Sequence, residues 1–93
     1  MEACPAKFAL GQVVITRPAL ALAESHGIDV IDLVRRHASG DWGDLGGHDK
    51  VLNEAALSNG SRIFSAYDVQ GERWYVITEW DRSYTTVMLS SAY

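Results

Sequence analysis

The spacing of apolar residues changes along this chain and divides it into a helical half and a strand-rich half. In the first half, apolar positions recur every three to four residues, as on one face of a helix. In the second half, apolar and polar positions tend to alternate, as they do in a half-buried strand. The change comes near Gly60 and predicts an α+β fold, in which three short helices pack on an antiparallel sheet of three to four strands.

Capping residues indicate where the three helices begin and end. The first should follow Thr16 and stop at Gly27, because glycine readily adopts the left-handed conformation that ends a helix. The second should follow Asp29, a good N-cap, and stop before Gly40. The third is predicted over about 49–58, and its expected inward face consists of Val51, Leu52, Ala55 and Ala56.

Strands are predicted at 61–69, 72–80 and 84–90, with 10–16 as a candidate fourth strand. The short gaps between the last three require antiparallel hairpins. In the middle strand, the residues expected on one face are Trp74, Val76, Thr78 and Trp80, and those on the other are Tyr75, Ile77 and Glu79. Helices should cover one face and leave aromatic side chains on the other for a second small core or for a partner.

Composition and charge narrow the functional classes. We expect a flexible arm over residues 1–8 and a single domain over 9–93, and Cys4 has no second cysteine for an internal disulfide. No apolar run or leader pattern predicts a membrane span or a secretory signal, so a cytoplasmic location is expected. The formal net charge is −4 and the basic residues are scattered, which disfavours direct nucleic-acid binding.

The glycine-punctuated stretch between Arg36 and Leu45 carries the most distinctive chemistry. Asp41 and Asp44, with His37 and His48 nearby, are oxygen and imidazole groups of the kind that bind divalent metals. Their spacing matches no established metal loop, and aspartates beside glycines are common turn and cap formers. We therefore expect turn structure here, with no metal and no cofactor.

A second polar cluster follows the middle strand. One interpretation is acid–base chemistry, which needs a carboxylate held near a nucleophile or proton source. The favoured interpretation is a tight turn in which Asp81 and Ser83 bond to nearby backbone, while Arg82 pairs with Glu79 or with an aspartate of the loop. With His37, expected to be half-buried and hydrogen-bonded, these residues form a predicted structural cluster of His37, Glu79, Asp81, Arg82 and Ser83, and no catalytic residue is assigned.

The chain resembles a family of small bacterial proteins of unassigned function that plasmids and other mobile elements often encode. The likeness covers most of the chain and is carried by Arg36-His37, Gly40-Asp41-Trp42-Gly43-Asp44-Leu45, Asp49-Lys50, Asn53-Glu54, Ala56-Leu57, Ser65-Ala66-Tyr67, Trp74, Ile77-Thr78-Glu79, Asp81-Arg82-Ser83 and Thr85-Thr86. Members are sometimes labelled restriction-modification subunits, although 93 residues leave no room for a methyltransferase domain. The resemblance implies a genetic setting in which small inhibitors of host defence complexes are one class of product.

Three functional hypotheses follow. The first is a non-enzymatic accessory protein that binds and occludes a larger protein or nucleoprotein complex, such as a CRISPR or restriction complex. The alternatives are a small metal-dependent or acid–base hydrolase and a homodimeric regulatory subunit. For the first hypothesis, the expected partner-binding residues combine acidic and aromatic side chains: Asp41, Trp42, Asp44, Asp49, Tyr75, Trp80 and Tyr84.

Overall fold

The computed structural model describes residues 6–93 and has the predicted α+β fold. The elements in chain order are β1 (Gln12–Ile15), α1 (Arg17–His26), α2 (Val30–Ala38), α3 (Gly47–Asn59), β2 (Ile63–Val69), β3 (Glu72–Thr78), β4 (Tyr84–Leu89) and a 3₁₀ turn, η1 (Ser90–Ala92). The sequence located these elements because their caps are local: Asp29 accepts a hydrogen bond from Ile31 N, and Gly27 and Gly60 end helices in the left-handed conformation.

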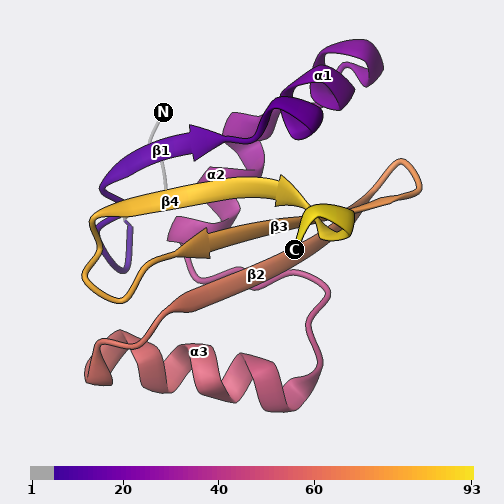
Figure 1. The fold of residues 1–93 in the computed structure, drawn as a ribbon. Helices are drawn as coiled ribbons and strands as arrows, with labels where there is room; N and C mark the ends of the chain where they lie inside the picture. The colour runs from indigo at the N-terminus through magenta and orange to yellow at the C-terminus, as the bar shows by residue number, and fades with distance from the viewer. Residues whose placement is uncertain (1–5) are drawn as a thin grey trace, which may run out of the picture.

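The four strands form one sheet in the order β1-β4-β3-β2 (Figure 1). The β2–β3 and β3–β4 pairs are antiparallel, as the short turns require. The β1–β4 pair is parallel, so the sheet is mixed and the prediction of an antiparallel sheet is wrong for this strand. A parallel partner is allowed here because all three helices and two strands separate β1 from β4 along the chain.

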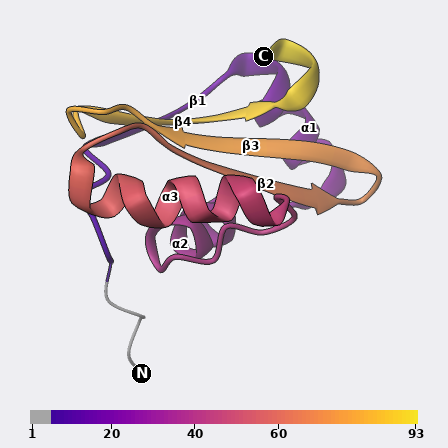
Figure 2. The same ribbon diagram turned by 90° about the horizontal axis from the view of Figure 1, so that it is seen from below.

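The helices lie mainly on one side of the sheet. In Figure 2, α2 and η1 lie on opposite sides of the sheet. The main core fills the covered side and includes the fully buried side chains of Trp74, Tyr67, Val76 and Val87. The opposite side, which we call the open face, carries Tyr75 and Ile77 of β3 together with Tyr84, Thr86 and Met88 of β4, which alternate with these core residues.

Helix α3 runs beside β2 at the edge of the sheet rather than across its face (Figure 1). In this position only a narrow strip of the helix meets the protein, and its buried residues are Asn53 and Ala56. The predicted inward face is therefore wrong for Val51 and Leu52, which are 65% and 54% exposed, and for Ala55, which is exposed as well. The sequence pattern assumed a helix lying flat on a core, which α3 does not do.

Two further predictions need correction at the ends of elements. Strand β3 ends at Thr78, so Trp80 lies in the following turn and is 67% exposed instead of continuing the buried face. The predicted loose arm is wrong for Lys7 and Phe8: Lys7 N donates to Ala38 O at 2.8 Å, and Phe8 packs edge-on against His37. The remainder of that arm, with Cys4, lies outside the described residues. Among residues 6–93, no helix has the length and apolar character needed to cross a membrane.

Candidate binding surface and the polar network beneath it

The loop that carries Asp41–Asp44 closes the outer edge of strand β2. Ala66 N donates to Trp42 O at 3.3 Å, and Asp44 N donates to Ala66 O at 2.7 Å. The Asp44 carboxylate then accepts Asp68 N at 2.9 Å. The glycine-punctuated loop therefore gives the outer edge of β2 hydrogen bonds like those that a neighbouring strand would form.

Asn53 of α3 extends this closure by one residue pair. Its side-chain amide donates to Phe64 O at 2.6 Å, and its carbonyl accepts Phe64 N at 3.1 Å. Alternate backbone groups of β2 from Phe64 to Asp68 are thus paired on the outer side. A covered edge offers no template to another strand, which protects a sheet against edge-to-edge association.

Gly43 and Trp42 hold the loop against β2. Gly43 has a φ of +74°, and a Cβ there would lie 2.1 Å from Ala66 O, so only glycine fits this approach. Trp42 is 4% exposed, and its indole Nε1 donates to Glu54 at 2.8 Å. The assignment of Trp42 to a partner-binding surface is therefore wrong, because its ring is enclosed by the protein itself.

The two loop aspartates have internal partners. The guanidinium of Arg36 donates to Asp41 at 2.8 Å, and this bond, with a further one from Gly43 N, keeps the pKa of the Asp41 carboxyl below its usual value. Arg36 in turn lies 4.4 Å from the centre of the Tyr67 ring, whose hydroxyl donates to Asp41 O. Asp41 and Asp44 consequently stabilise the loop through these hydrogen bonds.

His37 lies at the centre of a buried hydrogen-bonded chain that the sequence did not predict. Its Nδ1 lies 2.6 Å from Ser65 Oγ, and its Nε2 lies 2.9 Å from Thr78 Oγ1. Thr78 Oγ1 is 2.7 Å from Thr85 Oγ1, which donates to Leu10 O at 2.8 Å. The expected half-burial of His37 is wrong, since its exposure is 0%.

Proton counting fixes the tautomer of His37. Because Thr85 gives its hydroxyl proton to a carbonyl, it accepts from Thr78, and Thr78 must then accept from His37 Nε2–H. Nδ1 of the neutral ring is left as the acceptor for the Ser65 hydroxyl. Burial, reinforced by the charge of Arg82, lowers the pKa of His37 to about 3.

The Ser65–His37 pair has the short contact of a nucleophile and its base. Both residues have an exposure of 0%, however, and a substrate has no path to either side chain. The geometry therefore describes a satisfied core network that joins α2 to β2, β3 and β4.

The side chain of Arg82 binds backbone carbonyl groups of three segments of the chain. The predicted salt bridge from Arg82 to Glu79 or to an aspartate of the loop is therefore wrong. Its guanidinium donates to the carbonyl oxygens of Ser61, Glu79, Trp80 and Ala56 at 2.8–3.2 Å. Ala56 O belongs to the last turn of α3, where a positive charge is favoured by the helix dipole. The predicted turn is confirmed for Asp81, which accepts Ser83 N at 3.0 Å and whose pKa is lowered by hydrogen bonds from Ser83.

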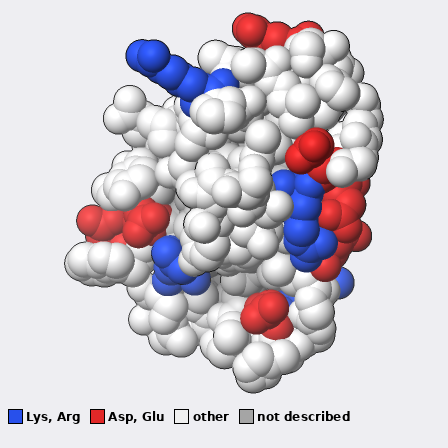
Figure 3. Space-filling model, turned by 45° about the vertical axis from the view of Figure 1, so that its right-hand side comes forward, with Lys and Arg blue, Asp and Glu red and all other residues white. Residues whose placement is uncertain are grey.

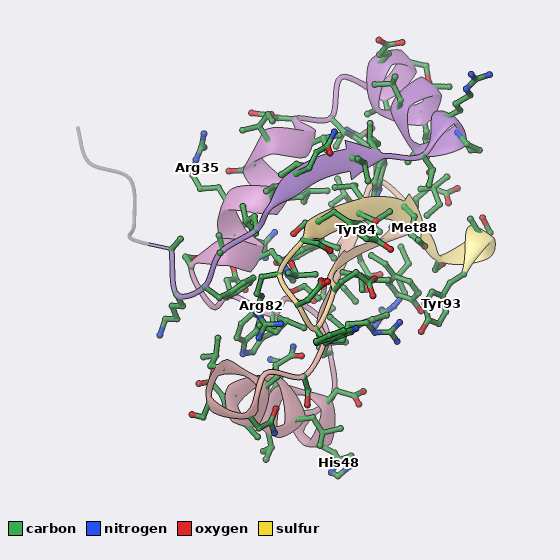
Figure 4. The ribbon with its side chains drawn as sticks, turned by 60° about the vertical axis from the view of Figure 1, so that its left-hand side comes forward. Arg35, His48, Arg82, Tyr84, Met88 and Tyr93 are labelled. Atoms are coloured by element: carbon green, nitrogen blue, oxygen red, sulfur yellow. The ribbon has the colours of Figure 1, made fainter. Side chains whose placement is uncertain are left out.

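Outside this network, aromatic side chains lie at both ends of β4. Trp80, in the turn before β4, and Tyr84, at its start, are 67% and 43% exposed. Near the other end, Tyr93 is 64% exposed and packs at 5.5 Å against the half-buried Tyr75. We call these four residues the open-face aromatic surface. Figure 4 shows Tyr84 and Met88 along β4 and Tyr93 beyond its end, while Arg35 points away into solvent.

Charged side chains do not form a continuous stripe. On the side drawn in Figure 3, basic and acidic groups stand near one another around the margin and leave the centre uncharged. Asp49, in the first turn of α3, is the one expected partner-binding aspartate outside the loop, and it is exposed. Within residues 6–93, no three His, Cys, Asp or Glu side chains come together as a metal ion would require.

Comparison of the chain with protein-family models, with curated proteins and with solved structures gives no match.

Proposed function

We propose that this protein is a small non-enzymatic binding protein that occludes a surface of a larger protein or nucleoprotein complex. The open-face aromatic surface is the contact region. Large rings at an interface supply most of the binding free energy, because they bury much area and lose little conformational entropy.

One observation carries the proposal: exposed aromatic side chains lie at both ends of β4, while His37, Asp41 and Asp44 are bound within the fold. Trp80 and Tyr84 remain 67% and 43% exposed. His37 is enclosed, Asp41 pairs with Arg36, and Asp44 binds the backbone of β2. These three side chains, which the hydrolase hypothesis required, thus have structural contacts.

Charge favours a partner with a basic or mixed surface. The net charge of −4 and the exposed Asp49 would attract such a partner and speed its encounter. The family resemblance adds a class of candidate, since inhibitors of host defence complexes act by occlusion. Binding of this kind needs no cofactor and no turnover.

The test is capture of the partner from a native host with tagged protein, followed by an activity assay of the captured complex. We expect the wild-type protein to block the complex at stoichiometric concentration. The double variant Trp80→Ala/Tyr84→Ala should lose both capture and inhibition. Ile31→Ala is the matched control, because Ile31 is a 60% exposed apolar residue on α2, on the other side of the sheet.

Loss of binding in Ile31→Ala, or its retention in the folded double variant, would contradict the proposed surface. Catalytic turnover of a substrate by the purified protein would contradict the non-enzymatic function itself.

The outer edge of β1, which no strand among residues 6–93 covers, favours a second candidate, a homodimeric regulatory subunit. Strand β1 is terminal in the sheet, and Val13 and Val14 are 42% and 37% exposed. An unpaired edge is a ready site for strand addition by a second copy. Sedimentation velocity would show a dimer that Val13→Lys converts to a monomer; a wild-type monomer at high concentration would exclude this candidate.

A further inference from the structure

A hollow of about 420 Å³ lies between α3, the open side of β2 and β3, and the C-terminal residue. This volume falls in the range of sites for small molecules. Its lining combines apolar, aromatic and charged side chains: Leu45, Asp49, Leu52, Asn53, Arg62, Phe64, Arg73, Tyr75 and Tyr93. The hollow is lined neither by Asp41–Asp44 of the loop nor by His37 of the buried network.

Three rings in mutual contact form the wall of the hollow. The Phe64 and Tyr75 centroids are 4.6 Å apart, and Tyr93 lies edge-on to both, at 5.6 and 5.5 Å. Such a wall favours a flat apolar group that stacks on one ring and meets the edge of another. The exposed side chain of Leu52 lies on the α3 side of the same hollow.

The charge of the hollow is opposite to that of the chain. Two arginines and one aspartate line it, whereas the protein as a whole has a net charge of −4. Arg73 is already paired with Asp68 at 3.1 Å. Arg62 has no carboxylate within 4.0 Å among residues 6–93; it donates to the Tyr93 hydroxyl at 2.8 Å and lies beside that ring.

We propose that this hollow binds a small planar anion, in which an aromatic ring carries a carboxylate or phosphate group. The ring stacks in the Phe64–Tyr75–Tyr93 wall, and Arg62 receives the anionic group, because a guanidinium matches carboxylate and phosphate oxygens in a two-pronged geometry. The hollow shares Tyr75 and Tyr93 with the open-face aromatic surface, but anion binding is measured on the isolated protein, without the macromolecular partner.

The test is an NMR titration of the purified protein with benzoate and phenyl phosphate. Benzyl alcohol, benzylamine and inorganic phosphate are matched probes that lack the charge, reverse it or lack the ring. We expect saturable shifts at Phe64, Tyr75 and Tyr93 with at least one aromatic anion, and affinity about tenfold weaker for each matched probe, from the loss of one charged hydrogen bond or of ring stacking.

Variants then locate the site. Arg62→Gln should weaken aromatic-anion binding about tenfold, because it removes the charged donor and keeps a similar length. Arg35→Gln is the control, since Arg35 is an exposed arginine on α2 that points away from the hollow (Figure 4). If Arg62→Gln alters the fold, as judged by its spectrum, Tyr93→Ala provides the same test through the ring wall. No saturable binding of either anion, equal binding of benzylamine, or equal affinity in Arg62→Gln and wild type would overturn the proposal.

Discussion

At the scale of single residues, His37, Asp41 and Arg82 have hydrogen-bond partners within the fold. His37 illustrates this, because each of its two ring nitrogens has one hydroxyl partner and no exposed surface. A buried network that satisfies all its members fixes the packing of the elements that supply them. The histidine was recognisable in the sequence as part of an apolar helix face, but its partners Ser65 and Thr78 were not, since they come from strands 28 and 41 residues away.

The low pKa of His37 predicts how stability depends on pH. The folded-state pKa of about 3 lies below the ordinary 6.5, so the unfolded chain takes up a proton first as the pH falls. The free energy of unfolding contributed by this group is fully present above pH 6.5 and is lost towards pH 3. Between pH 6.5 and 5 we expect a loss of about 2 kcal/mol, measured by urea unfolding. In His37→Gln this dependence should vanish over the same interval; an equal slope in both proteins would contradict the neutral, buried histidine.

Trp42 gives a second prediction at this scale. Its ring is 4% exposed and its Nε1 is bound to Glu54, so Trp42→Ala leaves a cavity and an unpaired carboxylate. Chemical denaturation should show a destabilisation of about 3–5 kcal/mol. The exposed Trp80 is the natural comparison, and Trp80→Ala should cost less than about 1 kcal/mol. Similar losses of unfolding free energy in the two variants would contradict the burial of Trp42 or the exposure of Trp80.

Among the elements, the loop and α3 lie at the edge of the sheet, where they hydrogen-bond to the outer backbone groups of β2. Local signals in the sequence placed the helices and hairpins, because caps, glycines and alternation act over a few residues. The parallel pairing of β1 with β4 and the edge position of α3 depend on contacts between distant segments, which local patterns do not encode. For the same reason the aspartates of the loop were interpreted as partner-binding, while their bonds to β2 were not foreseen.

The closure of β2 predicts the effect of removing Asn53. Asn53→Ala leaves the Phe64 N–H and C=O without partners, and each uncompensated backbone group costs about 1–3 kcal/mol. We expect a lower melting temperature and, from the freed edge, concentration-dependent association in light scattering. Asn59→Ala is the control, because Asn59 is the last residue of the same helix and its side chain bonds, among residues 6–93, only to Ser61 N. Unchanged stability and solubility in Asn53→Ala would show that α3 does not protect the edge.

The molecule as a whole has one side of its sheet covered by helices and one side that is largely open. The covered side holds the core and the polar network, and the loop and α3 close one edge. The open face retains exposed rings, and the sequence predicted this asymmetry from the two apolar faces of β3 without showing which aromatics stay exposed. Of the expected partner-binding residues, Asp49, Tyr75, Trp80 and Tyr84 remain candidates, Trp42 is removed, and Asp41 and Asp44 have structural roles.

If binding depends on the open-face aromatic surface, removal of its exposed rings should change the dissociation rate of the captured partner. Surface-immobilised partner should release Trp80→Ala/Tyr84→Ala about thirtyfold faster than wild type, as expected for a loss of about 2 kcal/mol at a hot spot. Asp49→Lys should instead slow association and weaken its salt dependence, while Ile31→Ala leaves both rates unchanged. A folded Trp80→Ala/Tyr84→Ala variant that dissociates at the wild-type rate would contradict the account.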